Sequence, residues 1–136
     1  MAIGVVVIGA QTAGLSAAAQ ARRKSPSLPV TVLDWGRFAG TPTCGLPWLL
    51  DISRDDDTLA RPPEALAGKY GFALRLGWEV VGVDWARREV RCRRDNGHEE
   101  AVPFLRLVIA TGASTKQLPS SAYWRDAPMH GSALRA

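Results

Sequence analysis

The feature that most constrains the fold is a run of β-branched apolar residues that ends in a glycine-bounded turn. Residues 4–8 read Gly-Val-Val-Val-Ile, the pattern of a strand buried on both faces of a parallel sheet. Gly9 ends this strand, and the alanine-rich segment 13–24 predicts a helix that Ser25-Pro26 terminates. A second short apolar run follows at 30–33. The first third of the chain therefore predicts a βαβ unit.

The middle of the chain predicts one more helix and two kinds of strand. Proline is tolerated in a first helical turn, so Pro62 or Pro63 can open a helix that Gly71 closes. Alternating apolar and polar residues before and after an Asp-Asn-Gly turn indicate a small antiparallel meander. The expected elements are a helix to about residue 70, a strand over 72–76, meander strands over 79–85 and 89–94, and a buried parallel strand over 105–110.

Together these elements predict an α/β domain with a parallel sheet and a small antiparallel β-meander insertion. We expect this domain to span residues 1–118 and an irregular, polar tail to occupy 119–136. Residues 35–57 lose the periodic pattern and gain Gly, Pro, Thr and Asp, apart from an apolar patch at 46–50. Such a segment is typical of a functional loop.

Composition excludes several classes of protein. The chain has 136 residues, a 46% apolar composition and a net charge of +4, as expected for one soluble domain. Residues 3–21 are nearly uncharged, but glycines and glutamines interrupt them and no basic segment precedes them, so we predict neither a signal peptide nor a membrane span. The arginines clustered at 87–94 lack an aromatic stacking platform, so we interpret them as a solvated strand face rather than a nucleic-acid site.

The six residues of the first turn are candidates for binding a dinucleotide. Backbone amides at a helix N-terminus can face a pyrophosphate, and glycine lets the chain turn tightly and approach closely. Gln11 stands where the GxGxxG pattern has its middle glycine. Asp34 ends the second strand, where a carboxylate can accept hydrogen bonds from ribose hydroxyls. The alternative is a small helix packed tightly on a sheet, with an aspartate in the following turn.

The two cysteines have different predicted roles. They form no metal-ligand spacing, so we predict no metal site and no disulfide framework, and the reduced thiols favour a cytoplasmic location. Cys44 lies in the sequence Thr-Cys-Gly-Leu-Pro-Trp. A cysteine that opens a short helix has its thiolate stabilised by the helix dipole, which lowers the pKa of the thiol. The alternative for Cys44, and our interpretation of Cys92, is a small buried hydrophobe.

The order of these motifs resembles the FAD domain of one enzyme family. IGAQTAG, LD, TCGLPW, RPPEAL, EVVGVD and LVIATGA occur in that order between Ile3 and Pro119. They are similar to the FAD domain of coenzyme A disulfide reductases, NADH oxidases and persulfide reductases, a branch of the FAD-dependent pyridine nucleotide-disulfide oxidoreductases. The resemblance implies a Rossmann-like FAD-binding domain, here partial. It also implies one redox-active cysteine, because position 49 is leucine where relatives with a CxxxxC motif have their second cysteine.

The resemblance also implies the roles of particular residues. Cys44 is the implied catalytic thiol beside the flavin, forming a mixed disulfide, a sulfenic acid or a persulfide, with NAD(P)H as the electron donor once a further domain is supplied. The implied FAD contacts include the backbone near Val80 at the adenine. The full cofactor-binding set is Gly9, Ala10, Gln11, Thr12, Ala13, Gly14, Asp34, Thr43, Val80, Ala110, Thr111 and Gly112.

A polar stripe on the first helix is the candidate substrate site. Ser16, Gln20 and Arg23 are spaced i, i+4 and i+7, so they share one helix face. The resemblance implies that this face borders a coenzyme A-type thiol, disulfide or persulfide. The alternative is an ordinary solvent face. Gly40 and Thr43 depart from the serine and asparagine of coenzyme A reductases, which weakens coenzyme A as the specific substrate.

Three functional hypotheses follow. In the first, the chain is the FAD-binding portion of a flavin-dependent NAD(P)H:disulfide, NADH oxidase or persulfide oxidoreductase, truncated and without autonomous turnover. In the second, it is a non-catalytic nucleotide-binding module that associates with a partner chain carrying the remaining domains. In the third, it is a small NAD-binding Rossmann protein, against which the Cys-Gly-Leu-Pro sequence and the Ala-Thr-Gly near Gly112 argue.

Overall fold

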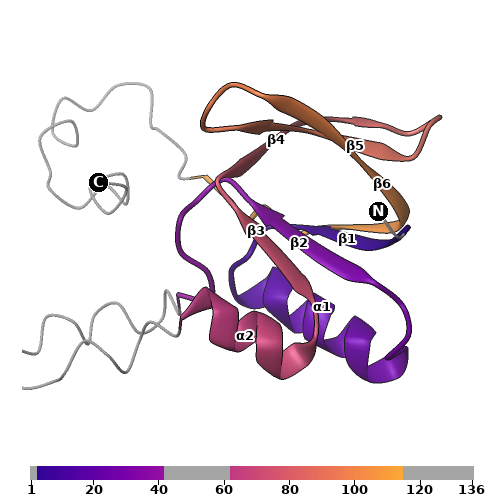
Figure 1. Cartoon of the computed structure of the whole chain (residues 1–136), viewed down its shortest axis with the longest axis vertical. Coiled ribbons are helices and arrows are strands. Elements are labelled where there is room, and N and C mark those ends of the chain that lie inside the picture. The colour runs from indigo at the N-terminus through magenta and orange to yellow at the C-terminus, as the bar shows by residue number, and fades with distance from the viewer. Residues whose placement is uncertain (1–2, 42–61, 115–136) are drawn as a thin grey trace, which may run out of the picture.

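A computed structural model of the chain describes residues 3–41 and 62–114. Within these ranges, two helices and one six-stranded sheet form an α/β domain (Figure 1). The strand order is β3-β2-β1-β6-β5-β4. The elements are β1 (Gly4–Ile8), α1 (Thr12–Lys24), β2 (Val30–Asp34), α2 (Pro63–Tyr70), β3 (Ala73–Leu76), β4 (Trp78–Asp84), β5 (Glu89–Arg94) and β6 (Glu99–Ile109). The predicted fold class is confirmed.

The parallel half of the sheet is built around β1. This strand pairs in parallel with β2 on one side and with β6 on the other, and β3 extends the parallel order beyond β2. Both helices lie on one face of these strands (Figure 1). That face contributes Val5, Val7, Val30 and Val32 to a core that also includes Ala18 of α1. The predicted βαβ unit is therefore present and carries the helix-side core.

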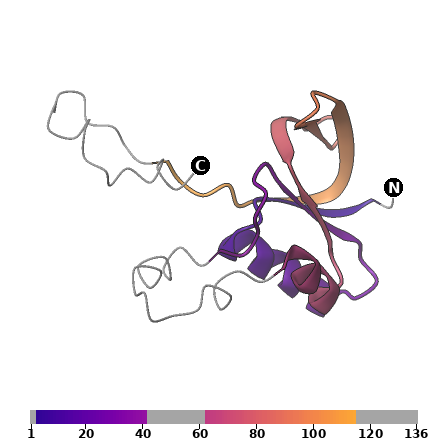
Figure 2. The same ribbon diagram turned by 60° about the vertical axis from the view of Figure 1, so that its left-hand side comes forward.

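The meander covers the opposite face of the parallel strands. β4, β5 and the beginning of β6 pair in antiparallel order and arch over the strands on the side away from the helices (Figure 2). Val90, Cys92 and Val102 are completely buried there, where they pack with Val6 and Leu33 of the parallel strands. The arginines at 87, 88, 91, 93 and 94 are exposed, as expected for a solvated face.

The last strand differs from its prediction. We expected a buried parallel strand over 105–110, whereas β6 is one strand of 11 residues that begins at Glu99. Its first part pairs antiparallel with β5 up to Pro103, and from Phe104 it pairs parallel with β1. Pro103 cannot donate to a ladder, and it lies where the pairing passes from β5 to β1. Two apolar residues of β6, Leu105 and Ile109, are 42% and 59% exposed rather than buried.

Trp78 connects the meander to the edge of the parallel strands. The guanidinium groups of Arg75 and Arg94 both lie over its ring, with their central carbons 4.6 and 4.1 Å from the ring centroid. Glu100 accepts a hydrogen bond of 3.0 Å from Arg94 and lies 3.6 Å from a nitrogen of Arg75. These cation–π and ionic contacts connect the side chains of β3, β4, β5 and β6 to one another.

Cys92 is a buried hydrophobe, which agrees with its interpretation from sequence. Its side chain is 0% exposed, and its sulfur lies 3.8 Å from the carbonyl oxygen of Val90. Burial, helped by the negative charge of Glu100 and opposed by Arg75, raises the pKa of the Cys92 thiol from 9.0 to about 11. The neutral thiol is therefore favoured in the folded chain.

This pKa predicts a loss of stability at high pH. Between pH 9 and 11 the unfolded chain releases the Cys92 proton while the folded chain keeps it, so the free energy of unfolding decreases as pH rises. We expect this thiol to account for about 2 kcal/mol over that interval. Urea unfolding of the wild type and Cys92→Ala at pH 8 and pH 10.5 measures it. The wild type should lose more stability than the variant, and an equal loss in both contradicts the assignment.

Candidate functional site

The turn between β1 and α1 requires its two glycines. Gly9 has φ of +106°, a conformation that L side chains rarely adopt. A Cβ at Gly9 would overlap the carbonyl oxygen of Ala110, and one at Gly14 would overlap the carbonyl oxygen of Gly9. At Gly14 the backbone of α1 therefore lies directly against the backbone of the turn. At Gly9 the turn lies directly against the backbone at the end of β6.

The first turn of α1 presents amide donors toward this turn. Gln11 is the N-cap residue, and its side chain makes no capping hydrogen bond. The first intrahelical bond runs from the amide of Leu15 to the carbonyl of Gln11, at 2.9 Å. The N–H groups of Thr12, Ala13 and Gly14 precede that bond, and the first turn contains no acidic residue. These donors and the positive end of the helix dipole form an arrangement suited to a pyrophosphate.

Asp34 joins the end of β2 to the same turn. One carboxylate oxygen accepts a hydrogen bond of 2.6 Å from the amide of Ala10, and the other accepts one of 2.7 Å from the amide of Gly36. The residue is 9% exposed. The sequence predicted that this carboxylate accepts hydrogen bonds from ribose hydroxyls, which stays a prediction. In the structure it shapes the turn by binding two backbone amides.

The end of β6 supplies the third side of the candidate site. The amide of Ala110 donates to the carbonyl of Ile8 at 2.8 Å, which continues the β1–β6 pairing up to Gly9. Thr111 and Gly112 follow, both exposed, with Gly112 at φ +75°. The carboxyl ends of β1, β2 and β6 thus meet at one edge of the sheet, where ligands bind in open α/β sheets.

The remaining predicted cofactor residues are placed differently. Val80 lies in β4 of the meander, partly buried against the meander-side core. Thr43 and the predicted catalytic Cys44 lie outside the described residues, which reach Thr41 before the gap. The structure therefore brings together the glycine turn, Asp34 and Ala110, and leaves the assignment of the redox thiol to the sequence.

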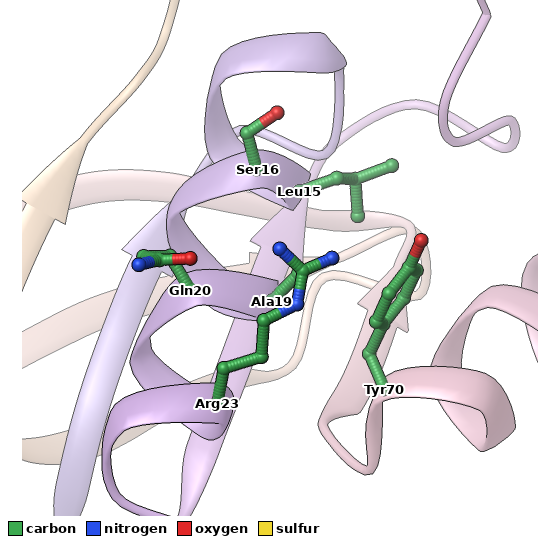
Figure 3. Close-up of a pocket in the computed structure, with 6 residues that line it drawn as sticks. All are labelled: Leu15, Ser16, Ala19, Gln20, Arg23 and Tyr70. Carbon is green, nitrogen blue, oxygen red and sulfur yellow. The ribbon is translucent and has the colours of Figure 1, made fainter.

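The three predicted substrate residues line one cavity. Ser16, Gln20 and Arg23 of α1 line an open cavity of about 380 Å³, and Tyr70 of α2 lies across from Arg23 (Figure 3). The guanidinium carbon of Arg23 is 5.7 Å from the centroid of the Tyr70 ring, and the amine of Lys69 is 5.2 Å from it. The complete lining is Leu15, Ser16, Ala19, Gln20, Arg23 and Tyr70.

The cavity has the chemistry of an anion site with an aromatic wall. Among the described side chains that line the cavity none is acidic, so a phosphate could interact with Arg23 without competition from any of them. Sequence reasoning missed Tyr70 and Lys69, because the pattern of α2 does not show which of its residues face α1. The only sequence signal was their place in the last turn of the helix, just before Gly71.

The fold and this edge of the sheet define a dinucleotide-binding α/β domain. A family model described as pyridine nucleotide-disulphide oxidoreductase matches residues 3–133. The chain belongs to this family, as the order of its motifs predicted. The family is flavin-dependent and uses NAD(P)H; one solved structure similar to this chain is a water-forming NADH oxidase from Lactobacillus brevis bound to NADH, at 24% identity and a TM-score of 0.75.

Sulfur-metabolising enzymes are among the similar proteins. The chain is 36% identical, over 117 residues, to an NAD(P)H coenzyme A polysulfide/persulfide reductase of Pyrococcus horikoshii, covering 85% of this chain and 25% of that protein. It is 30% identical to an NAD-dependent persulfide reductase from A. fulgidus of solved structure, with a TM-score of 0.78, covering 90% of this chain and 24% of that one. The chain thus spans about a quarter of the length of these relatives.

The structure also bears on a membrane location. Neither of the two helices in the described ranges is long and apolar enough to span a bilayer.

The close approach at Gly14 predicts a large effect of one methyl group. Gly14→Ala places a Cβ against the Gly9 carbonyl, so we expect it to lower the free energy of unfolding by about 3 kcal/mol or more. Gly68→Ala is the matched control, since a Cβ in that part of α2 meets nothing within 4 Å and should stabilise the helix by about 0.5–1 kcal/mol. Chemical denaturation measures both. A Gly14→Ala chain as stable as the wild type would show that the turn is not closely packed.

Proposed function

We propose that the chain is the FAD-binding portion of a flavin-dependent, NAD(P)H-linked oxidoreductase that reduces a sulfur substrate through Cys44. The observation that carries the proposal is the amide-rich N-terminus of α1 facing the carboxyl ends of β1, β2 and β6. The sulfur-reducing relatives named above support the reaction class. In this proposal residues 1–118 form the domain, and residues 119–136 form an irregular tail.

The residues at the turn fit a dinucleotide. A pyrophosphate against α1 would accept hydrogen bonds from the first-turn amides, and the absence of side chains at Gly9 and Gly14 allows this close approach. Asp34 would hold the turn in shape and accept from a ribose hydroxyl, since a carboxylate oxygen that accepts one amide has a further lone pair. Bound FAD would supply the electron transfer between nicotinamide and sulfur.

Cys44 is the proposed nucleophile toward a disulfide. Its thiolate sulfur attacks one sulfur of the substrate, a new disulfide bond forms at Cys44, the substrate S–S bond breaks, and one thiolate leaves. Reduction of the resulting mixed disulfide needs electrons from NAD(P)H through FAD. In our proposal a nicotinamide-binding domain, in the same polypeptide or in a partner chain, delivers them.

The cavity beside α1 is the proposed site for the thiol substrate. Arg23 and Lys69 offer positive charge and Tyr70 offers an aromatic face, which matches a phosphate-bearing nucleotide such as that of coenzyme A. Gly40, one of the two departures from the coenzyme A reductases, has φ of +69°, a conformation that favours glycine over serine. A coenzyme A-type thiol or disulfide stays the proposed class of substrate.

A second candidate function is association with a partner chain. Two large apolar side chains of β6, Leu105 and Ile109, are exposed, and Ile109 immediately precedes Ala110 at the candidate FAD site. Such residues favour burial against another polypeptide. In this alternative the chain binds the nucleotide for a separately encoded enzyme. Formation of a stable complex with a chain carrying the nicotinamide domain, without reaction at Cys44, would favour it.

Coenzyme A disulfide tests the proposed thiol chemistry without a completed enzyme. We expect one coenzyme A adduct per chain in the wild type and in Cys92→Ala, and none in Cys44→Ser. Cys92 is buried and its pKa is raised to about 11, so it should not react in the folded chain. Intact-mass and peptide mass spectrometry measure the adduct. An adduct on Cys92 alone, or no adduct on Cys44, would contradict the proposal.

Substitution of Arg23 tests the proposed substrate cavity. Arg23→Ala should slow adduct formation with coenzyme A disulfide by about tenfold, the usual effect of losing a charged hydrogen bond. Its rate with uncharged hydroxyethyl disulfide should not change. Arg91→Ala removes an exposed arginine of β5 and serves as the charge-matched control. Equal slowing by both disulfides, or equal slowing in the Arg91 variant, would refute a specific role for the cavity.

A further inference from the structure

Gln11 makes two long-range hydrogen bonds from the position where the dinucleotide pattern has a glycine. Its side-chain nitrogen donates to the carbonyl of Phe38 at 3.3 Å, and its side-chain oxygen accepts from the amide of Thr41 at 3.1 Å. The partners lie 27 and 30 residues away in sequence. One side chain thus binds both a donor and an acceptor of the segment that follows β2.

Backbone contacts hold the same segment against the turn. The amide of Gly40 donates to the carbonyl of Ala10 at 2.8 Å, and Gly36 donates to Asp34. Ala39 is 4% exposed and packs in the helix-side core. The end of this segment, residues 38–41, therefore lies against the β1–α1 turn. Gln11 contributes the side-chain contacts at the end of this segment, contacts that a glycine could not make.

The hydrogen bonds of Gln11 connect two segments that lie next to residues with proposed functional roles. Gln11 is the residue that immediately precedes α1, next to the amides proposed to bind pyrophosphate. Thr41, at the other end of the contact, is three residues before Cys44. A side-chain amide with both of its polar atoms engaged has a defined orientation, so the position of the turn and the position of Thr41 depend on each other.

We infer that Gln11 is a positioning residue that couples the cofactor turn to the chain segment leading into the redox cysteine. The inference rests on the proposed function of Cys44, but the coupling itself concerns described residues. In this inference Gln11 acts through Thr41, to which its side chain is hydrogen-bonded. In place of the close approach that glycine allows, this chain has a side-chain link between the two parts of its site.

The link is tested first by amide exchange in the full chain without cofactor. Gln11→Met keeps the length of the side chain and removes both hydrogen bonds, and Gln11→Glu keeps an oxygen that accepts from Thr41. Removal of one acceptor should speed exchange at the Thr41 amide by about three- to tenfold in the Met variant, with less change in the Glu variant. Lys24→Met is the control, because Lys24 is an exposed residue of the same helix and lies outside both the turn and the cavity. Equal Thr41 exchange in the wild type and Gln11→Met would overturn the link.

The consequence for the thiol is tested by the pH profile of alkylation at Cys44. Gln11→Met should move the alkylation profile of Cys44 to higher pH, toward that of an ordinary thiol, while Lys24→Met leaves the wild-type profile unchanged. A purely structural role would lower the unfolding midpoint without moving this profile. An unchanged profile in Gln11→Met would overturn the positioning role.

The failure of this inference can be distinguished from the failure of the proposed function. Flavin absorbance of the wild type after incubation with FAD, followed by removal of free FAD, reports on cofactor binding alone. A wild type that binds no flavin would refute the proposed cofactor, whereas the exchange comparison would still decide the link. A flavin-binding wild type with identical Thr41 exchange in all variants would refute the link and leave the proposed function intact.

Discussion

The close approach of α1 to the end of β1 is the constraint on which the rest of the structure depends. No side chain fits at Gly14 without meeting the Gly9 carbonyl, and none fits at Gly9 without meeting Ala110. Because no side chain separates α1 from the end of β1, the amides of the first helical turn lie at the carboxyl ends of three parallel strands. Asp34 then binds the Ala10 amide from the neighbouring strand. The candidate cofactor site is a direct result of this packing.

Much of the fold could be predicted from local patterns, because they report on local physics. The structure confirms the strand predicted from the β-branched run and the helix predicted from the alanine-rich segment. The turn between them contains Gly9, and Gly14 lies in the first turn of the helix, as the sequence predicted. The spacing of Ser16, Gln20 and Arg23 likewise sufficed to place them on one face of α1. Whether they bind a substrate is a question that spacing alone does not answer.

The features that escaped prediction all depend on contacts between distant parts of the chain. The continuity of β6 through Pro103 depends on which neighbour each half of the strand pairs with. Tyr70 joins the cavity only because α2 packs beside α1. The hydrogen bonds of Gln11 span about thirty residues. In each case the local sequence is compatible with several arrangements, and the tertiary packing selects one.

Titration of the isotopically labelled chain with FAD shows whether the N-terminus of α1 binds this cofactor. Amide chemical shifts in nuclear magnetic resonance spectra report each backbone N–H separately. We expect saturable shifts at Thr12, Ala13 and Gly14, with tighter binding of FAD than of NAD. Shifts that avoid the first turn of α1, or tighter binding of NAD than of FAD, would contradict this expectation.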